Sequence, residues 1–85
     1  MSFFWGVYSS GQGPKLHKHP YEEVHIVEEG RAFFTLYDRE MLIDKDHVVI
    51  VPRDAPHKFV VNTSEDEPLR MISIHCSGKL ITEYL

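Results

Sequence analysis

The sequence predicts an all-β domain that closes as a sandwich or a barrel, and two observations support this prediction. Segments of strand length recur between turn signals along most of the 85 residues. No helical period extends over eleven or more residues before the C-terminus. Closure as a sandwich or a barrel hides most of the strand edges that such a chain exposes. The length suits one hydrophobic core, so we expect a single domain over residues 1–85.

The first four predicted strands are separated by residues that suit turns. They lie near Phe3–Ser9, Lys15–His19, Glu23–Glu28 and Arg31–Tyr37. Gly11-Gln12-Gly13-Pro14 separates the first two strands, and Glu29-Gly30 separates the last two. We expect Gly30 to have a positive φ in a tight hairpin.

Four more strands are predicted in the second half, again between turn residues. They lie near Glu40–Ile43, His47–Val51, His57–Val61 and Leu69–His75. The turns between them are Asp38-Arg39, Asp44-Lys45-Asp46, Pro52 to Pro56 and Asn62 to Pro68. The tail from Lys79 to Leu85 fits either a helical turn or a final strand.

Charge and hydropathy narrow the range of partners. The formal net charge is −4 and the basic residues are scattered, so nucleic acid is not expected as a partner. Phe3-Phe4-Trp5 is too short to cross a bilayer, and we expect no membrane role but a strand packed on the core or on a partner. A chain this small gains stability from self-association, which favours a homodimer.

The single cysteine and the N-terminus point to the compartment. Cys76 has no partner for an internal disulfide, and we expect its thiol to be a small buried hydrophobic group. Met1 is followed by neither a basic segment nor a long apolar run of the signal-peptide kind. We therefore expect a cytoplasmic protein.

Three histidines and a glutamate form the most informative pattern. His17 and His19 flank one residue, Glu23 follows four positions later, and His57 lies in the second half. In an extended segment alternate side chains share a face, so His17 and His19 can bind one ion. Taken singly, each of these residues would more often be an ordinary polar surface residue.

The spacing of these residues resembles the first motif of the cupin superfamily, G(X)5HXH(X)3,4E(X)6G. Gly11, His17, His19, Glu23 and Gly30 satisfy every fixed position. The resemblance extends from about Gly11 to His75, and it is to a small single-domain cupin of the conserved-barrel type. It implies a small double-stranded β-helix, or jelly-roll barrel.

The second cupin motif, G(X)5PXG(X)2H(X)3N, is met in part. Pro52 and His57 have the right separation, Asp46 and Asp54 stand where the glycines would be, and Asn62 is displaced by one position. Aspartate tolerates left-handed backbone better than most residues do, so these departures concern the shape of the loops more than the ligand.

The resemblance implies that His17, His19, Glu23 and His57 bind one divalent metal inside the barrel. Three imidazoles and a carboxylate suit Fe(II), Mn(II), Ni(II), Cu(II) or Zn(II). Four protein ligands in an octahedral field leave two positions for water, dioxygen or a chelating substrate. Glu22 competes with Glu23 for the carboxylate role, because a turn near Pro20 can shift the alternation of faces.

Other residues are candidates for the surroundings of the ion. His25 and Val27 share the face of Glu23, and His25 is a candidate general acid or base or a hydrogen-bonded interior histidine. Phe59 and Val61 share the face of His57 and are expected to give the cavity an apolar wall. His75 is a further pocket candidate, although the sequence leaves its face open. Tyr21, Arg53 and Asp54 are placed on turns, either at the mouth of the site or simply in solvent.

The resemblance favours a metalloenzyme that acts on a small oxygen-bearing organic molecule. Dioxygenation is the first reaction class, and isomerisation or decarboxylation of an oxo acid is the second. A metal-dependent module that binds a small molecule without turnover is the alternative, and a structural subunit with a filled interior is a third reading.

Overall fold

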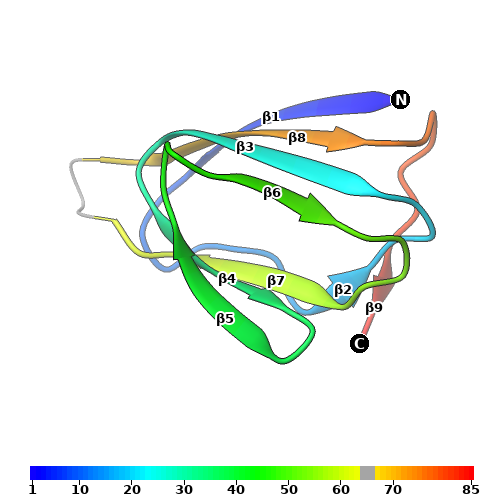
Figure 1. Cartoon of the computed structure of the whole chain (residues 1–85). Coiled ribbons are helices and arrows are strands. Elements are labelled where there is room, and N and C mark those ends of the chain that lie inside the picture. Colours follow the sequence, from blue (N-terminus) through cyan, green and yellow to red (C-terminus); the bar gives the residue numbers. More distant parts are fainter. Residues whose placement is uncertain (64–66) are drawn as a thin grey trace.

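The chain folds into two antiparallel β-sheets, as the computed structural model shows (Figure 1). The structure describes residues 1–63 and 67–85, so the centre of the predicted Asn62 to Pro68 turn lies outside the described residues. The described part contains nine strands and no helix: β1 (Ser2–Tyr8), β2 (His17–Lys18), β3 (Glu23–Glu29), β4 (Ala32–Leu36), β5 (Arg39–Ile43), β6 (Val48–Val51), β7 (His57–Val61), β8 (Leu69–His75) and β9 (Glu83–Tyr84).

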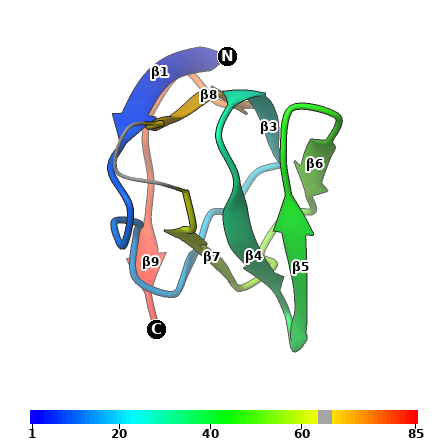
Figure 2. The same ribbon diagram turned by 90° about the vertical axis from the view of Figure 1, so that its left-hand side faces the viewer.

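The two sheets face each other and form the barrel. Sheet A has the order β1-β8-β3-β6, and sheet B has the order β5-β4-β7-β2-β9. Figure 2 looks along the barrel, with β1, β8, β3 and β6 on one wall and β9, β7, β4 and β5 on the other. The predicted all-β barrel fold is confirmed.

Alternation along the strands decides what fills the interior. On β3 and β7 every second residue is buried, which is the pattern expected of strands with one face on a core. The core is made of aliphatic and aromatic side chains from both sheets: Val27, Ala32, Phe34, Ile43, Val49, Val51, Ala55, Phe59, Val61, Leu69 and Met71. Most of this core fills one end of the barrel, although Val51 lies opposite Glu23, and the polar inward residues gather at the other end.

The structure settles three sequence-based predictions. The C-terminal tail forms a strand, because β9 pairs with β2. Asp54 has φ 60°, so aspartate does adopt the left-handed conformation at this motif position. Cys76 is exposed, and the prediction of a buried thiol was wrong because the residue lies one position beyond the end of β8.

Gly30 has a positive φ of 79°, but the hairpin predicted around it was wrong. Strand β3 pairs with β6 and β8, whereas β4 pairs with β5 and β7, so Gly30 carries the chain from one sheet to the other. A Cβ at Gly30 would lie 2.7 Å from the Pro68 carbonyl oxygen. Both the left-handed conformation and this close approach require glycine.

No helix in the described residues is long and apolar enough to span a membrane.

We expect Gly30→Ala to lower the stability of the fold. The left-handed conformation alone costs an alanine about 1–2 kcal/mol, and the crowding against Pro68 and Leu69 adds to this cost. Thermal unfolding followed by circular dichroism measures the change in Tm. Gly78→Ala is the matched control, because a Cβ there meets nothing within 4 Å and the backbone is not left-handed. Equal melting temperatures for the two variants would contradict the role given to Gly30.

Candidate metal centre

The four predicted ligands come from both sheets and meet at one end of the barrel. His17 on β2 lies directly opposite His57 on β7 in sheet B. His19 follows β2, and Glu23 is the first residue of β3 in sheet A. All four side chains are buried. Residues separated by up to forty positions in the chain therefore share one enclosed space.

The ligand atoms are spaced as one ion requires. One nitrogen or oxygen atom from each of the four residues lies within 4.8 Å of the other three. His57 Nε2 is 3.0 Å and His19 Nε2 is 3.5 Å from Glu23 Oε1. A first-row ion with bonds of about 2.1 Å holds neighbouring ligand atoms about 3–4 Å apart. The residues present fit a divalent metal.

Backbone carbonyls fix the orientation of the three histidine rings. Each Nδ1 donates to a carbonyl oxygen: His17 to Lys15 at 2.6 Å, His19 to Ile81 at 2.7 Å and His57 to Ala55 at 2.9 Å. Since a carbonyl only accepts, the proton of a neutral ring must be on Nδ1. Each Nε2 then presents its lone pair to the centre, which is the form of imidazole that binds metals.

These rings leave the Glu23 carboxylate in need of a cation. Burial raises the pKa of Glu23, but imidazole rings that carry a proton toward it, led by His25 and His57, hold that pKa well below its usual range. When the His57 ring is neutral with its proton on Nδ1, this support is lost and the carboxylate needs another cation. Burial also lowers the pKa of His17, which favours its neutral form. A buried anion beside lone pairs that cannot donate to it is stabilised by a metal ion placed between them.

His75 supports the carboxylate from the other side, which answers the question of the face it occupies. It is buried and lies opposite Glu23 in the β3–β8 register. Its Nε2 donates to Glu23 Oε2 at 2.8 Å, and its Nδ1 accepts from the Tyr21 hydroxyl at 2.7 Å. Burial lowers the pKa of His75, in keeping with a neutral ring that has one N–H to donate.

Tyr21 is a member of this chain of hydrogen bonds and is not exposed at the mouth. It is 5 % exposed, and its ring stacks on His19 with centroids 5.0 Å apart. The sequence placed it on a turn, either at the mouth of the site or in solvent, and its inward position depends on the hydrogen bond to His75, a residue distant in the chain. Glu22, by contrast, is exposed and pairs with Arg53 at 3.8 Å, so it does not reach the centre.

His25 presents a free nitrogen to the interior. Its Nδ1 lies 2.8 Å from the Ser73 hydroxyl, and the ring is 3 % exposed. Its Nε2 lies 3.4 Å from Glu23 Oε1 but has no hydrogen-bond partner in the part of the chain that the structure describes. A buried polar atom without a partner is available to an incoming ligand.

A cavity of about 240 Å³ adjoins the four ligands. Besides these ligands, the lining residues are Phe4, Tyr8, Pro14, His25, Phe59, Ser73, His75, Leu80, Thr82 and Tyr84. Phe59 and His75 both line the cavity, where the sequence predicted Phe59 and held His75 as a candidate with its face left open. Val27 and Val61 belong to the hydrophobic core and not to the lining, because they lie two residues deeper than His25 and Phe59. The C-terminal tail also forms a wall of the cavity, which the sequence did not predict, because this wall depends on the pairing of β9 with the distant strand β2.

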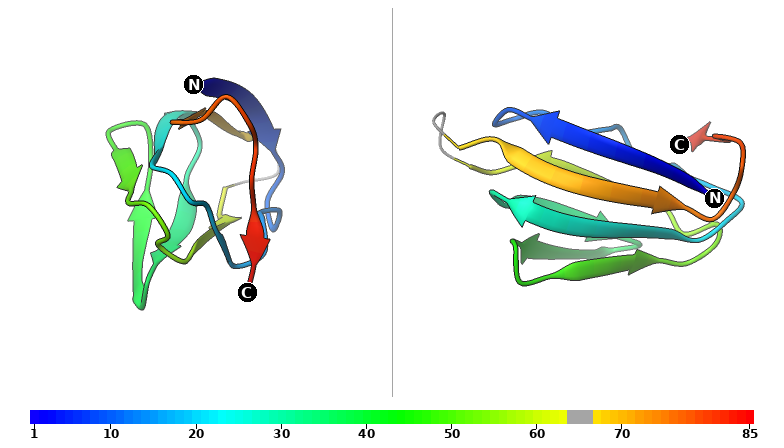
Figure 3. Two further views of the ribbon diagram at one scale, coloured as in Figure 1. Left: turned by 90° about the vertical axis from the view of Figure 1, so that its right-hand side faces the viewer. Right: turned by 90° about the horizontal axis from the view of Figure 1, so that it is seen from above.

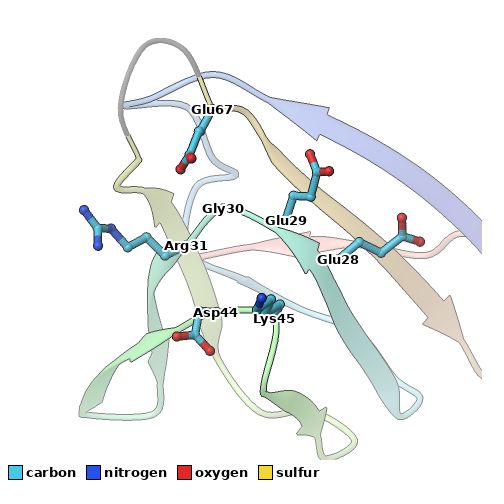
Figure 4. A pocket seen from close by; sticks show the side chains of 7 residues that line it. All are labelled: Glu28, Glu29, Gly30, Arg31, Asp44, Lys45 and Glu67. Atoms are coloured by element: carbon cyan, nitrogen blue, oxygen red, sulfur yellow. The ribbon is translucent and has the colours of Figure 1, made fainter.

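A second hollow lies at the opposite end of the barrel, near the Gly30 crossover (Figure 4). It has a volume of about 500 Å³ and is lined by Glu28, Glu29, Gly30, Arg31, Asp44, Lys45 and Glu67. Three of its charged groups make exposed surface contacts: Glu29 pairs with Arg70 at 3.1 Å, Asp44 pairs with His47 at 3.1 Å, and Arg31 donates to the Asn62 carbonyl at 2.9 Å. Exposed pairs of this kind are ordinary surface features, so this hollow is no candidate site.

Comparisons with known proteins agree with this geometry. The family model described as Cupin domain matches residues 4–75. No curated protein matches the sequence. A solved cupin-like protein from Thermotoga maritima is 25% identical, with a TM-score of 0.83 over 98% of this chain and 62% of that one.

Two further solved structures share the fold. A cupin 2 domain-containing protein from Halorhodospira halophila is 22% identical, with a TM-score of 0.88, over 96% of this chain and 56% of that one. Oxalate decarboxylase from Lactobacillus farciminis, in a formate complex, is 22% identical with a TM-score of 0.86 over 99% of this chain and 26% of that one. The chain thus spans less than two thirds of each of these proteins.

We expect Glu23→Gln to weaken metal binding and Glu22→Gln to leave it unchanged. Only the Glu23 carboxylate is buried among the imidazoles, so its charge is the one that the ion needs. Isothermal titration with Mn(II) or Zn(II) measures the Kd, and the rise of Tm on adding metal provides a second measurement. The reverse order of the two variants would mean that the ligand set is wrong.

We expect Tyr21→Phe and His75→Phe each to weaken metal binding about 10- to 100-fold, as hydrogen-bond partners of metal ligands do. His75→Phe frees Glu23 Oε2, and Tyr21→Phe removes the hydrogen bond that orients the His75 ring, so neither variant removes a metal ligand. Tyr37→Phe is the control, because that tyrosine is exposed on the β4–β5 turn. Metal titration reports the effect, and an unchanged Kd in both buried variants would refute the positioning role.

Proposed function

The chain belongs to the cupin family, and on this premise we propose that it is a metal-dependent enzyme acting on a small oxygen-bearing organic molecule. One observation carries the proposal: three histidine rings, held by backbone carbonyls, turn their free nitrogens and a buried carboxylate toward a common point beside a cavity. A site without a ligand space would support only a structural role for a metal.

His17, His19, Glu23 and His57 would hold the ion. Nitrogen and oxygen ligands without thiolates suit Fe(II), Mn(II), Ni(II), Cu(II) or Zn(II). Such an ion supplies a Lewis acid that polarises an oxygen of a bound ligand, and a redox-active one also supplies a site for dioxygen. The protein supplies the fixed ring orientations and the buried negative charge.

The cavity favours a small substrate. Its volume of about 240 Å³ lies below the range of about 300–1,000 Å³ that is usual for drug-sized ligands. Phe4 and Phe59 provide apolar contact, while Ser73 and the free Nε2 of His25 provide polar contact. A short acid, enol or carbonyl compound matches this mixture, and formate in the complex of the related oxalate decarboxylase is a molecule of this kind.

Dioxygenation is the reaction that we propose first. Both atoms of dioxygen would enter the substrate, so the reaction needs no external reductant. His25 would accept a proton from an enol or α-carbon at its free Nε2, since its Nδ1 can donate to the Ser73 hydroxyl. The same proton transfer favours isomerisation or decarboxylation of an oxo acid as the second candidate reaction.

A module that captures a small molecule without turnover remains the alternative proposal. The cavity beside the ligands argues against the third reading, a structural subunit with a filled interior. Turnover is what separates an enzyme from a binding module.

The test begins with native mass spectrometry of protein purified without oxygen, which reports bound metal, retained ligand and subunit number together. Protein loaded with each of the five metals is then assayed with short enols, β-diketones and oxo acids. An oxygen electrode follows dioxygenation, and NMR of anaerobic mixtures follows isomerisation and decarboxylation. We expect turnover with one metal and one substrate class.

His25→Gln separates the enzyme from the binding module. We expect this variant to retain metal and ligand while kcat falls about 10²- to 10⁴-fold, the usual effect of losing a general acid or base. Arg53→Gln is the control, because Arg53 is exposed and lies outside the cavity. Tight ligand binding without any turnover in the unmodified protein would establish the binding module instead.

A further inference from the structure

The outer face of sheet A is apolar across all four strands. Figure 3 (right) looks down on this sheet, with β1, β8 and β3 side by side. Strand registers align its outward side chains in two rows, Phe3–Ile74–Val24–Ile50 and Trp5–Ile72–Ile26–Val48. The outermost members are the most exposed: Phe3 is 65%, Trp5 71%, Val48 61% and Ile50 65% exposed. We call these eight residues the apolar face.

The outer face of sheet B shows what a solvated sheet in this molecule looks like. One of its rows is Leu42–Phe33–Val60, but the next is Glu40–Thr35–Lys58. This second row carries a glutamate and a lysine and is therefore well solvated, as is usual where one side of an antiparallel sheet faces water. On sheet A the charged row, Arg70–Glu29, lies beyond two adjacent apolar rows that cross all four strands. Contiguous exposed apolar patches of this kind on small proteins mark interaction sites.

We propose that the apolar face is the interface of a symmetric homodimer, in which sheet A packs on sheet A of a second copy. Two twisted sheets pack face to face with their strands within about 30° of each other. This inference is independent of the proposed enzymatic function, because the apolar face lies on the outside of the sheet whose inner side carries Glu23.

A two-fold axis running along the strands between β8 and β3 makes the face complementary to itself. This axis places β1 over the partner's β6 and β8 over the partner's β3. The bulky Phe3 and Trp5 then lie over the smaller Ile50 and Val48, and no aromatic side chain opposes another. An isologous interface requires such self-complementarity.

The charges at the border of the face fit the same arrangement. Arg70 and Glu29 lie opposite each other on β8 and β3, in the row next to Trp5–Ile72–Ile26–Val48, and pair at 3.1 Å. The same axis brings Arg70 of each copy over Glu29 of the other, so both ion pairs can be shared across the interface. Arg53 and Glu22 pair at the other end.

A second copy fits this face better than a charged partner does. Each end carries one arginine and one glutamate, and the chain has a net charge of −4, so nothing attracts nucleic acid or an anionic lipid surface. Four strands about 4.8 Å apart, with about seven residues at about 3.3 Å each, cover roughly 20 by 23 Å. This is at the lower end for dimers, so we expect an equilibrium that dilution can shift.

The single tryptophan of the chain provides a direct test, since Trp5 lies in the proposed interface. We expect sedimentation velocity to show twice the chain mass at high concentration and the single mass on dilution. Over the same range, Trp5 emission should move to longer wavelength as the indole enters water. A chain that stays monomeric at every concentration overturns the proposal. If that monomer also floats with phosphatidylcholine vesicles, the apolar face binds a lipid surface instead of a second copy.

Substitutions then locate the interface. Trp5→Glu and Val48→Glu should each give monomers, whereas Leu42→Glu, on the outer face of sheet B, should leave the dimer intact. The double variant Trp5→Glu with Val48→Lys should dimerise more tightly than Trp5→Glu, because the two new charges meet across the axis. Circular dichroism confirms folding of each variant. A dimer that survives both single substitutions, or is lost equally in Leu42→Glu, refutes the assignment.

Discussion

The structure depends on one buried carboxylate. Glu23 lies between two sheets, with four imidazoles within 3.5 Å of its oxygens. A charge in such a place is tolerated only when its surroundings compensate it. His75, which is oriented by Tyr21, donates a hydrogen bond to one oxygen, and the other oxygen faces imidazole nitrogens whose protons point away from it. The charge of Glu23 is therefore compensated fully only when a cation is bound, and the two sheets hold the ligands of that cation in place.

Strand β3 shows how one segment serves two environments. Its inward residues are Glu23, His25 and Val27, which pass from the metal centre to the cavity and then to the core. Its outward residues, Val24 and Ile26, lie in the apolar face. A shift of one residue in register would exchange these sets and place a carboxylate on an apolar surface. The pairing of β3 with β8 and β6 is thus fixed from both sides.

The sequence was sufficient for the fold class and for the four candidate ligands, because alternation and spacing are local properties. His17 and His19 share a face in any extended segment, and the motif spacing added Glu23 and His57. The sequence was not sufficient for contacts made by pairing between distant strands. The position of His75 follows from the β3–β8 register, and the inward turn of Tyr21 follows from its bond to His75. The Gly30 crossover was mistaken for a hairpin because a glycine reports a backbone conformation but not which strands pair next.

The segment from residue 81 to residue 85 is tied to the metal centre more closely than its exposure suggests. The carbonyl of Ile81 accepts from the His19 ring, β9 pairs with β2, and the Leu85 amide donates to Leu16. Order in this segment and occupancy of the centre are thermodynamically coupled, and such coupling acts in both directions. Metal binding should make residues 81–85 more ordered. A partner that displaces this segment from β2 should lower the affinity of the centre for the ion. Contacts made by the exposed strand β9 can therefore change the metal affinity of a buried site.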